Sequence, residues 1–74
     1  MITRKYFKIE VFAHALSRER AKRFRYRQDD MDALCGLPKG TWAQYESAQR
    51  APSLENLCKV ADALGVSVTE LIGK

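Results

Sequence analysis

The sequence has very few of the residues from which catalytic or metal sites are built. Its 74 residues include one histidine and two cysteines, and His14, Cys35 and Cys58 are not spaced as ligands of one metal ion. The only close serine–histidine pair is His14 with Ser17, and no glycine-rich loop suited to phosphate is present. We therefore expect no enzyme activity, no metal and no cofactor.

The sequence also lacks an apolar run of the ~18–20 residues that a membrane span requires, and its start has no signal-peptide pattern. Its length is that of one small domain. We expect a cytoplasmic protein without membrane contact. In that compartment both cysteines should be reduced and serve as small apolar packing residues.

Acidic residues are scarce in the first third of the chain. Residues 1–27 contain nine Lys or Arg but only two Glu, a net charge of +7, whereas residues 28–74 contain four basic and seven acidic residues, a net charge of −3. Six of the ten residues 18–27 are basic. This concentration favours a polyanionic partner, nucleic acid above all, over a merely solvated helix face.

Apolar periodicity and helix-end signals predict five helices and no strand, which is an all-α fold. The expected helices cover residues 9–24, 28–35, 39–47, 54–64 and 68–72. Residues 1–8 are expected to form a basic arm and residues 9–74 one domain. Phe12 and Leu16 should face the core, and Tyr26 should be buried in the turn after the first helix.

Glycine and proline mark the ends of the second and third helices. Gly36 supplies the left-handed conformation that ends the second helix, and Pro38 suits the first turn of the third. Gly40 would then lie inside the third helix, at a cost of about 1 kcal/mol relative to alanine. Trp42 and Tyr45, three residues apart, are expected to pack together in the core.

The fourth helix has the clearest pattern. Ser53 can cap it and Gly65 can end it. The stripe predicted to face the core consists of Leu54, Leu57, Cys58, Ala61 and Leu64. Ser67 and Glu70 then form a capping box, which predicts the short fifth helix.

Residues 28–53 predict two short helices joined by a glycine turn and followed by a loop that ends in Pro-Ser. This segment resembles the helix-turn-helix of the Cro/cI-type repressor family, also called the XRE family, in which Gln28 would open the motif and residues 28–47 would be the helix-turn-helix proper. Other family positions are occupied in register by Met31, Gly36, Leu37, Trp42, Tyr45, Glu46, Pro52 and Ser53. The resemblance covers about residues 12–72. It implies a compact five-helix, lambda-repressor-like domain that binds DNA.

Four positions depart from the family pattern. The family usually has alanine at the position of Asp32 and commonly has glycine at that of Ala48. It usually has a capping residue at the positions of Arg27, before helix two, and Pro38, before helix three. A buried carboxylate without a partner would be strongly destabilising. Asp32 is therefore expected to pair with Arg20 or Arg23, or to remain at the edge of the protein.

The resemblance implies which side chains contact DNA. Affinity comes mainly from phosphate contacts and specificity from base edges. Base contacts are expected from Lys39, Gly40, Ala43 and Gln44. Phosphate contacts are expected from Arg27, Gln28, Thr41, Gln49 and Arg50. The side-chain amide of Gln44 can pair with N6 and N7 of adenine.

The resemblance also implies contacts within and between protein chains. Arg20 and Glu46 are expected to form a structural ion pair. Family members commonly bind palindromic operators as homodimers. The expected dimer contacts, which could instead close the core, are Val66, Val68, Leu71 and Ile72. Arg4, Lys5 and Lys8 could wrap around DNA as an arm or form a merely soluble terminus.

These features favour a sequence-specific transcriptional regulator, a small repressor that binds double-stranded operator DNA through the helix at residues 39–47. A controller protein of a restriction system is a variant of this hypothesis. Two alternatives remain open. One is an antitoxin whose toxin contact uses the apolar segment 6–11, and the other is a protein-interaction module that has lost DNA binding, which Asp32 and Gly40 make conceivable.

Overall fold

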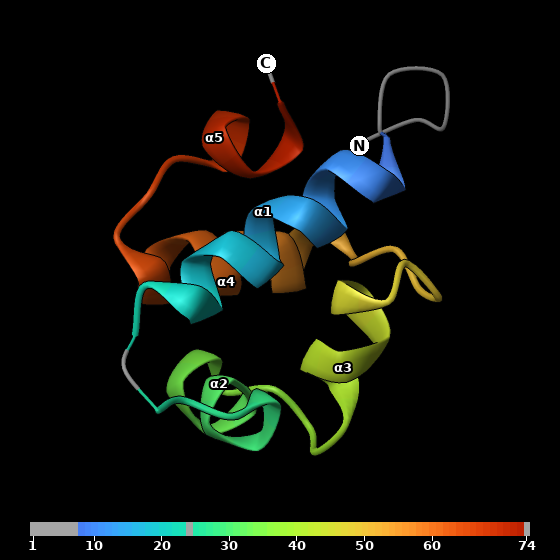
Figure 1. Cartoon of the computed structure of the whole chain (residues 1–74). Coiled ribbons are helices and arrows are strands. Elements are labelled where there is room, and N and C mark those ends of the chain that lie inside the picture. Colours follow the sequence, from blue (N-terminus) through green and yellow to red (C-terminus); the bar gives the residue numbers. More distant parts are fainter. Residues whose placement is uncertain (1–7, 24, 74) are drawn as a thin grey trace.

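The computed structural model describes residues 8–23 and 25–73, and all regular structure in this part of the chain is helical (Figure 1). The helices are α1 (Ile9–Ala21), α2 (Gln28–Cys35), α3 (Thr41–Glu46), α4 (Leu54–Leu64) and α5 (Val68–Ile72). The predicted all-α fold of five helices is confirmed. None of these helices is long and apolar enough to cross a membrane.

The helix-turn-helix pair lies at one end of the molecule. In Figure 1, α1 and α4 cross the middle, α5 lies on one side of them, and α2 and α3 lie together on the other side. Helix α1 contacts α3 and α5, α4 contacts α2 and α5, and α2 contacts α3. The pair α2–α3 is therefore supported from behind by α1 and α4.

The core is a single cluster of apolar side chains from all five helices. Phe12 and Leu16 of α1 and Trp42 and Tyr45 of α3 are buried as predicted. The rings of Phe12 and Tyr45 meet edge to face, with centroids 5.6 Å apart. The other members of the cluster include Met31, Leu37, Leu57, Val60, Leu64 and Leu71. Because each large apolar side chain contributes about 1.5–3 kcal/mol when buried, this cluster is the main source of stability.

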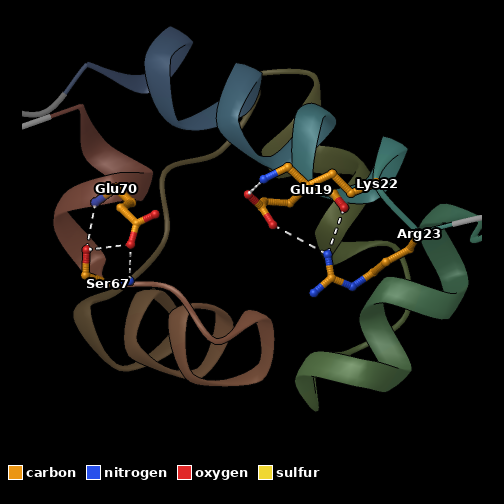
Figure 2. A network of polar contacts seen from close by, with 5 residues as sticks. All are labelled: Glu19, Lys22, Arg23, Ser67 and Glu70. Atoms are coloured by element: carbon orange, nitrogen blue, oxygen red, sulfur yellow. Dashed lines mark hydrogen bonds and ion pairs between the residues drawn. The ribbon is translucent and has the colours of Figure 1, made fainter.

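The bounds of α2, α4 and α5 are those that the capping signals predicted. Gly36 ends α2 in the left-handed conformation, with φ 68°, and Ser53 caps α4 through its side chain. Figure 2 shows the capping box of α5. Ser67 Oγ accepts a hydrogen bond from the Glu70 amide at 3.2 Å, and Glu70 Oε1 accepts one from the Ser67 amide at 3.1 Å.

Helix α1 ends at Ala21, three residues before its predicted end. Phe24, the last residue of the predicted helix, lies outside the described residues, as do Arg4 and Lys5 of the predicted arm. Lys8 is exposed and immediately precedes the helix.

Helix α3 begins two residues later than predicted. Gly40 is its N-cap residue, with φ 88°, and does not lie inside the helix, so the predicted penalty for an internal glycine does not arise. The cause is a tight turn that begins at Pro38, whose carbonyl accepts a hydrogen bond from the Thr41 amide at 3.1 Å. A residue with a Cβ atom would be strained at the backbone angles of Gly40.

Two apolar side chains that were predicted to be buried face solvent. Tyr26 is 41% exposed and Leu54 is 52% exposed. The buried face of α4 is formed by Leu57, Val60, Ala61 and Leu64. This face includes Val60 in place of Leu54.

The two cysteines are free thiols in different environments. Cys35 is buried in the core, as predicted, and burial raises the pKa of its thiol to about 11. Cys58 is exposed on α4, so the prediction that it is a packing residue is wrong. The buried face of α4 contains Leu57 and Val60 instead.

Two basic residues that follow α1 are engaged within the protein. Glu19 is 7% exposed and its carboxylate accepts hydrogen bonds from Lys22 Nζ at 2.9 Å and Arg23 Nη1 at 3.5 Å (Figure 2). Burial alone would raise the pKa of Glu19, but these two cations outweigh it and lower the pKa. Part of the positive charge of residues 18–27 is therefore paired with Glu19 within the protein.

An ion pair joins α1 to α3. Arg20 donates from Nε to Glu46 Oε1 at 2.9 Å and from Nη2 to Glu46 Oε2 at 2.7 Å. The indole N–H of Trp42 also donates to Glu46 Oε1, at 2.6 Å. The hydrogen bonds from Arg20 hold the pKa of Glu46 below its ordinary value. Both carboxylate oxygens are thus occupied, and the C-terminal end of α3 is fixed against α1.

We expect acid to weaken the fold through Glu46. Because its pKa in the folded chain lies below the ordinary value of 4.5, its contribution is fully present above that pH and is lost as the pH falls through the lower folded value. Glu46→Gln should reduce the free energy of unfolding at pH 7 by about 1–2 kcal/mol, between the values typical of exposed and buried ion pairs. Urea denaturation at a series of pH values should show a shallower acid dependence for this variant than for the wild type.

The matched control is Glu55→Gln. The side chain of Glu55 is 80% exposed and its Oε2 lies 3.8 Å from Lys59 Nζ, so its replacement should change the free energy of unfolding by less than about 0.5 kcal/mol. An acid dependence that is the same in the wild type and in Glu46→Gln would contradict the role given to this pair.

Candidate nucleic-acid interface

Helix α3 is held by one face and presents the other to solvent. Trp42 and Tyr45 are buried in the core, whereas Gln44 is exposed and Lys39, just before the helix, is exposed as well. Gly40 and Ala43, the other two predicted base contacts, are half-buried. The long polar side chains of Lys39 and Gln44 therefore extend from this end of the molecule. Beside them, Gly40 has no side chain and Ala43 has only a small one.

The loop after α3 folds back onto Gln44. The carbonyl oxygen of Gln44 accepts a hydrogen bond from the Gln49 amide at 2.9 Å, and its side-chain oxygen accepts one from Arg50 Nη1 at 3.5 Å. Gln49 and Arg50 are exposed. The structure thus brings a predicted base contact and two predicted phosphate contacts together at the end of α3.

Ala48 begins this loop in the left-handed conformation, with φ 62°. Glycine adopts this conformation without steric cost, whereas alanine is strained there by its Cβ atom. This geometry is the physical reason for the glycine that the family commonly has at this position.

The start of α2 lies beside the Arg20–Glu46 pair. After Arg20 and Trp42, a smaller hydrogen-bonding contribution from Gln28 also lowers the pKa of Glu46. The side chain of Arg27 is exposed. Its backbone N–H donates to Asp30 Oδ2 at 2.8 Å. A carboxylate of α2 therefore provides the hydrogen-bond partner for the amide of the N-cap residue of the same helix.

Thr41 is only 7% exposed, which contradicts its predicted phosphate contact. It is the first residue of α3, and the turn from Pro38 rotates its side chain toward the protein instead of toward solvent. The predicted phosphate contacts that remain accessible are Arg27, Gln28, Gln49 and Arg50.

Asp32 is 4% exposed, and its predicted pairing with Arg20 or Arg23 is wrong. Those two arginines instead bind Glu46 and Glu19, respectively. The carboxylate of Asp32 accepts hydrogen bonds from backbone amides, Gly40 N–H at 2.8 Å and Trp42 N–H at 2.7 Å. A carboxylate in α2 therefore caps the start of α3.

One of the four predicted dimer contacts is unavailable at the surface. Leu71 is 1% exposed and belongs to the core, since the single turn of α5 uses it to close the molecule against α1 and α4. Its assignment to a dimer contact is wrong. Val66, Val68 and Ile72 are partly buried and pack against the same core.

Asn56 was missed by the sequence analysis. Its Nδ2 donates to the hydroxyl oxygen of Tyr45 at 3.0 Å, which ties α3 to α4 and satisfies the polar end of a buried tyrosine. Nothing in the local sequence marks this contact. The capping role of Asp32 did have a signal in the sequence. The residues before α3 offer no capping side chain, and α2 contains a carboxylate that can replace it.

No group of three His, Cys, Asp or Glu residues within 8–23 and 25–73 is placed to hold a metal ion. The charged and polar groups of this end of the molecule are instead long, exposed side chains and backbone amides, which suit contact with an extended surface.

Comparison with known proteins places this geometry in a family. A helix-turn-helix family model (HTH_3) matches residues 18–71. Among curated proteins, the chain is 40% identical over 47 residues to the cryptic phage CTXphi transcriptional repressor RstR of Vibrio cholerae, covering 64% of this chain and 42% of that protein. It is 46% identical over 41 residues to the HTH-type transcriptional regulator AnsR of Bacillus subtilis, covering 55% of this chain and 35% of that protein. The chain thus spans about two fifths or less of the length of these relatives.

Two solved structures share the arrangement of the helices. A hypothetical transcription factor from Neisseria, NHTF, superposes with a TM-score of 0.79 at 26% identity, covering 86% of this chain and 72% of that one. The restriction-modification controller protein C.AhdI from Aeromonas hydrophila superposes with a TM-score of 0.76 at 29% identity, covering 93% of this chain and 99% of that one. The chain belongs to the helix-turn-helix family of the Cro/cI (XRE) type, as the motif at residues 28–53 predicted.

Proposed function

We propose that this chain is a sequence-specific DNA-binding transcriptional regulator, a repressor, that recognises operator DNA in the major groove with α3. The observation that supports this most directly is the exposed side of α3. Gln44 faces solvent there, next to Arg50, and Lys39 is exposed just before the helix, whereas Trp42 and Tyr45 are buried. A helix anchored in this way can enter a groove without losing its place in the core.

The exposed side chains have the chemistry for both kinds of DNA contact. The amide of Gln44 can donate to N7 and accept from the N6 amino group of adenine, and Lys39 can donate to O6 and N7 of guanine or to a phosphate. Arg27, Gln28, Gln49 and Arg50 flank α3 and are the proposed phosphate contacts. Gly40 and Ala43 have no long side chain and would let the backbone approach the base edges.

The charge of the chain supports a polyanionic partner. Residues 1–27 contain nine basic residues, of which Lys22 and Arg23 pair with Glu19 and Arg20 pairs with Glu46, so a net positive charge remains. Phosphate contacts of this kind release counterions, so the affinity should fall as salt is added.

The names of the relatives support the same function. RstR is named a transcriptional repressor and AnsR a transcriptional regulator, which belong to a non-enzymatic class. C.AhdI is a restriction-modification controller protein, so the controller variant of the proposal remains consistent with the fold. The antitoxin alternative relied on residues 6–11, of which 6 and 7 lie outside the described residues, and no contact of the described part favours it.

We also propose that the chain binds a palindromic operator as a homodimer, with half-sites about one helical turn of DNA apart. Val66, Val68 and Ile72 support this part of the proposal. They are partly exposed apolar side chains in and just before α5, and α5 lies on the side of the molecule opposite the α2–α3 pair (Figure 1). Cytoplasmic location follows from a role in transcription.

Selection of bound duplexes from a random DNA library should enrich a palindromic sequence. The variant Gln44→Ala should relax the preference at one base pair of each half-site, with a loss of about 1–3 kcal/mol in discrimination there. The matched comparison is Gln49→Ala, which should weaken binding to all sequences alike and leave the enriched sequence unchanged. Failure of the wild type to enrich any sequence would contradict the proposed function.

Arg50→Ala should reduce the salt dependence of binding. The loss of one phosphate contact should lower the slope of log K against log salt by about 1, which fluorescence anisotropy with a labelled duplex can measure at several salt concentrations. Lys59→Ala is the control, because Lys59 is exposed on α4 and pairs only with Glu55 among the ion pairs of the described residues. A slope that is unchanged in Arg50→Ala would exclude Arg50 from the phosphate contacts.

A further inference from the structure

Asp32 makes three hydrogen bonds across the turn of the helix-turn-helix. Its backbone carbonyl accepts from Leu37 N–H at 2.9 Å, its Oδ2 from Gly40 N–H at 2.8 Å and its Oδ1 from Trp42 N–H at 2.7 Å. Asp32, in the second half of α2, thus binds the backbone at three points. They are the start of the turn, its end, and the first residues of α3.

Helix α3 has no cap of its own. Its N-cap residue is Gly40, which has no side chain, and no side-chain cap bond is formed there. Pro38 offers a carbonyl oxygen to Thr41 but has no side chain that could accept a hydrogen bond. The first amides of a helix lack partners within the helix, so the carboxylate of Asp32 supplies what the local sequence does not.

Both oxygens of Asp32 are needed for this role. Each one accepts from a different amide, and Asp32 as a whole is 4% exposed. A buried negative charge is stabilised by charge-assisted hydrogen bonds and by the positive end of a helix. Asparagine would retain the shape but would turn an NH₂ group toward one of the two N–H donors.

The two amides held by Asp32 lie on either side of Thr41, between the proposed base contacts Lys39 and Gln44. Because the N–H groups of Gly40 and Trp42 are occupied, they are not free to bind phosphate, and recognition must rely on side chains of α3 and of the residues just before it. Those side chains are useful only if α3 is held within about 0.5 Å of the position that fits the groove.

We propose that Asp32 is a positioning residue for DNA recognition. Its carboxylate fixes the start of α3 to α2 and thereby sets where Lys39 and Gln44 meet the bases. This inference rests on the proposed function. It assigns to Asp32 a role in specificity that is separate from the phosphate contacts.

The test compares Asp32→Asn with Asp62→Asn, which makes the same change of charge at an exposed position of α4. Each protein is first shown to be folded by circular dichroism. Two quantities are then measured: amide hydrogen exchange at Gly40 and Trp42, and the ratio of affinities for the selected duplex and a scrambled duplex at one salt concentration. Asp32→Asn should exchange at least one of the two amides about tenfold faster and lower the affinity ratio about tenfold, with the affinity for the scrambled duplex unchanged within about twofold. Asp62→Asn should match the wild type in both.

Asp32→Glu is measured in the same way, since it keeps the charge and changes only the reach of the carboxylate. A lowered affinity ratio in this folded variant also supports the inference, and it serves as the deciding variant if Asp32→Asn does not fold. A wild-type affinity ratio in a folded Asp32 variant overturns the inference while the proposed function stands. A wild type that does not distinguish the two duplexes overturns the proposed function and this role of Asp32 together, whatever the exchange rates are.

Discussion

Helix α3 has six residues, and an isolated helix of that length is not stable in water. Its conformation must therefore come from contacts with the rest of the protein. Trp42 and Tyr45 bury its inner face, Asp32 binds the amides at its start, and the Arg20–Glu46 pair holds its end against α1. The other four helices can be understood as the support that keeps this short helix in one position.

The buried acidic groups show how this support is arranged. Glu19, Asp32 and Glu46 each lie at the end of a helix or beside one, and each has its oxygens matched to specific donors. A carboxylate that is desolvated without such donors would destabilise the fold. Asp32 and Glu46 thereby link neighbouring helices, whereas the donors to Glu19 are Lys22 and Arg23, which follow it directly at the end of α1.

The parts of the fold that local sequence determines were predictable. The ends of α2, α4 and α5 follow from Gly36, Ser53 and the Ser67–Glu70 box, because capping depends on residues within one turn. The start of α3, the exposure of Tyr26 and the burial of Leu71 depend on how the helices pack, and no local pattern reports that. Of the candidate site, the exposed Gln44 and Arg50 could be anticipated from the motif, whereas the capping role of Asp32 requires two helices to be placed together.

The most direct test of the account is to map the DNA contact on the protein itself. Amide chemical shifts of the ¹⁵N-labelled chain should be followed by NMR as the selected duplex is added, with a scrambled duplex for comparison. The shifts specific to the selected duplex should centre on Lys39 to Gln44, with further changes at Gln28 and Arg50 and little change in α5. Specific shifts centred instead on α5 or on the outer face of α1 would contradict recognition through α3.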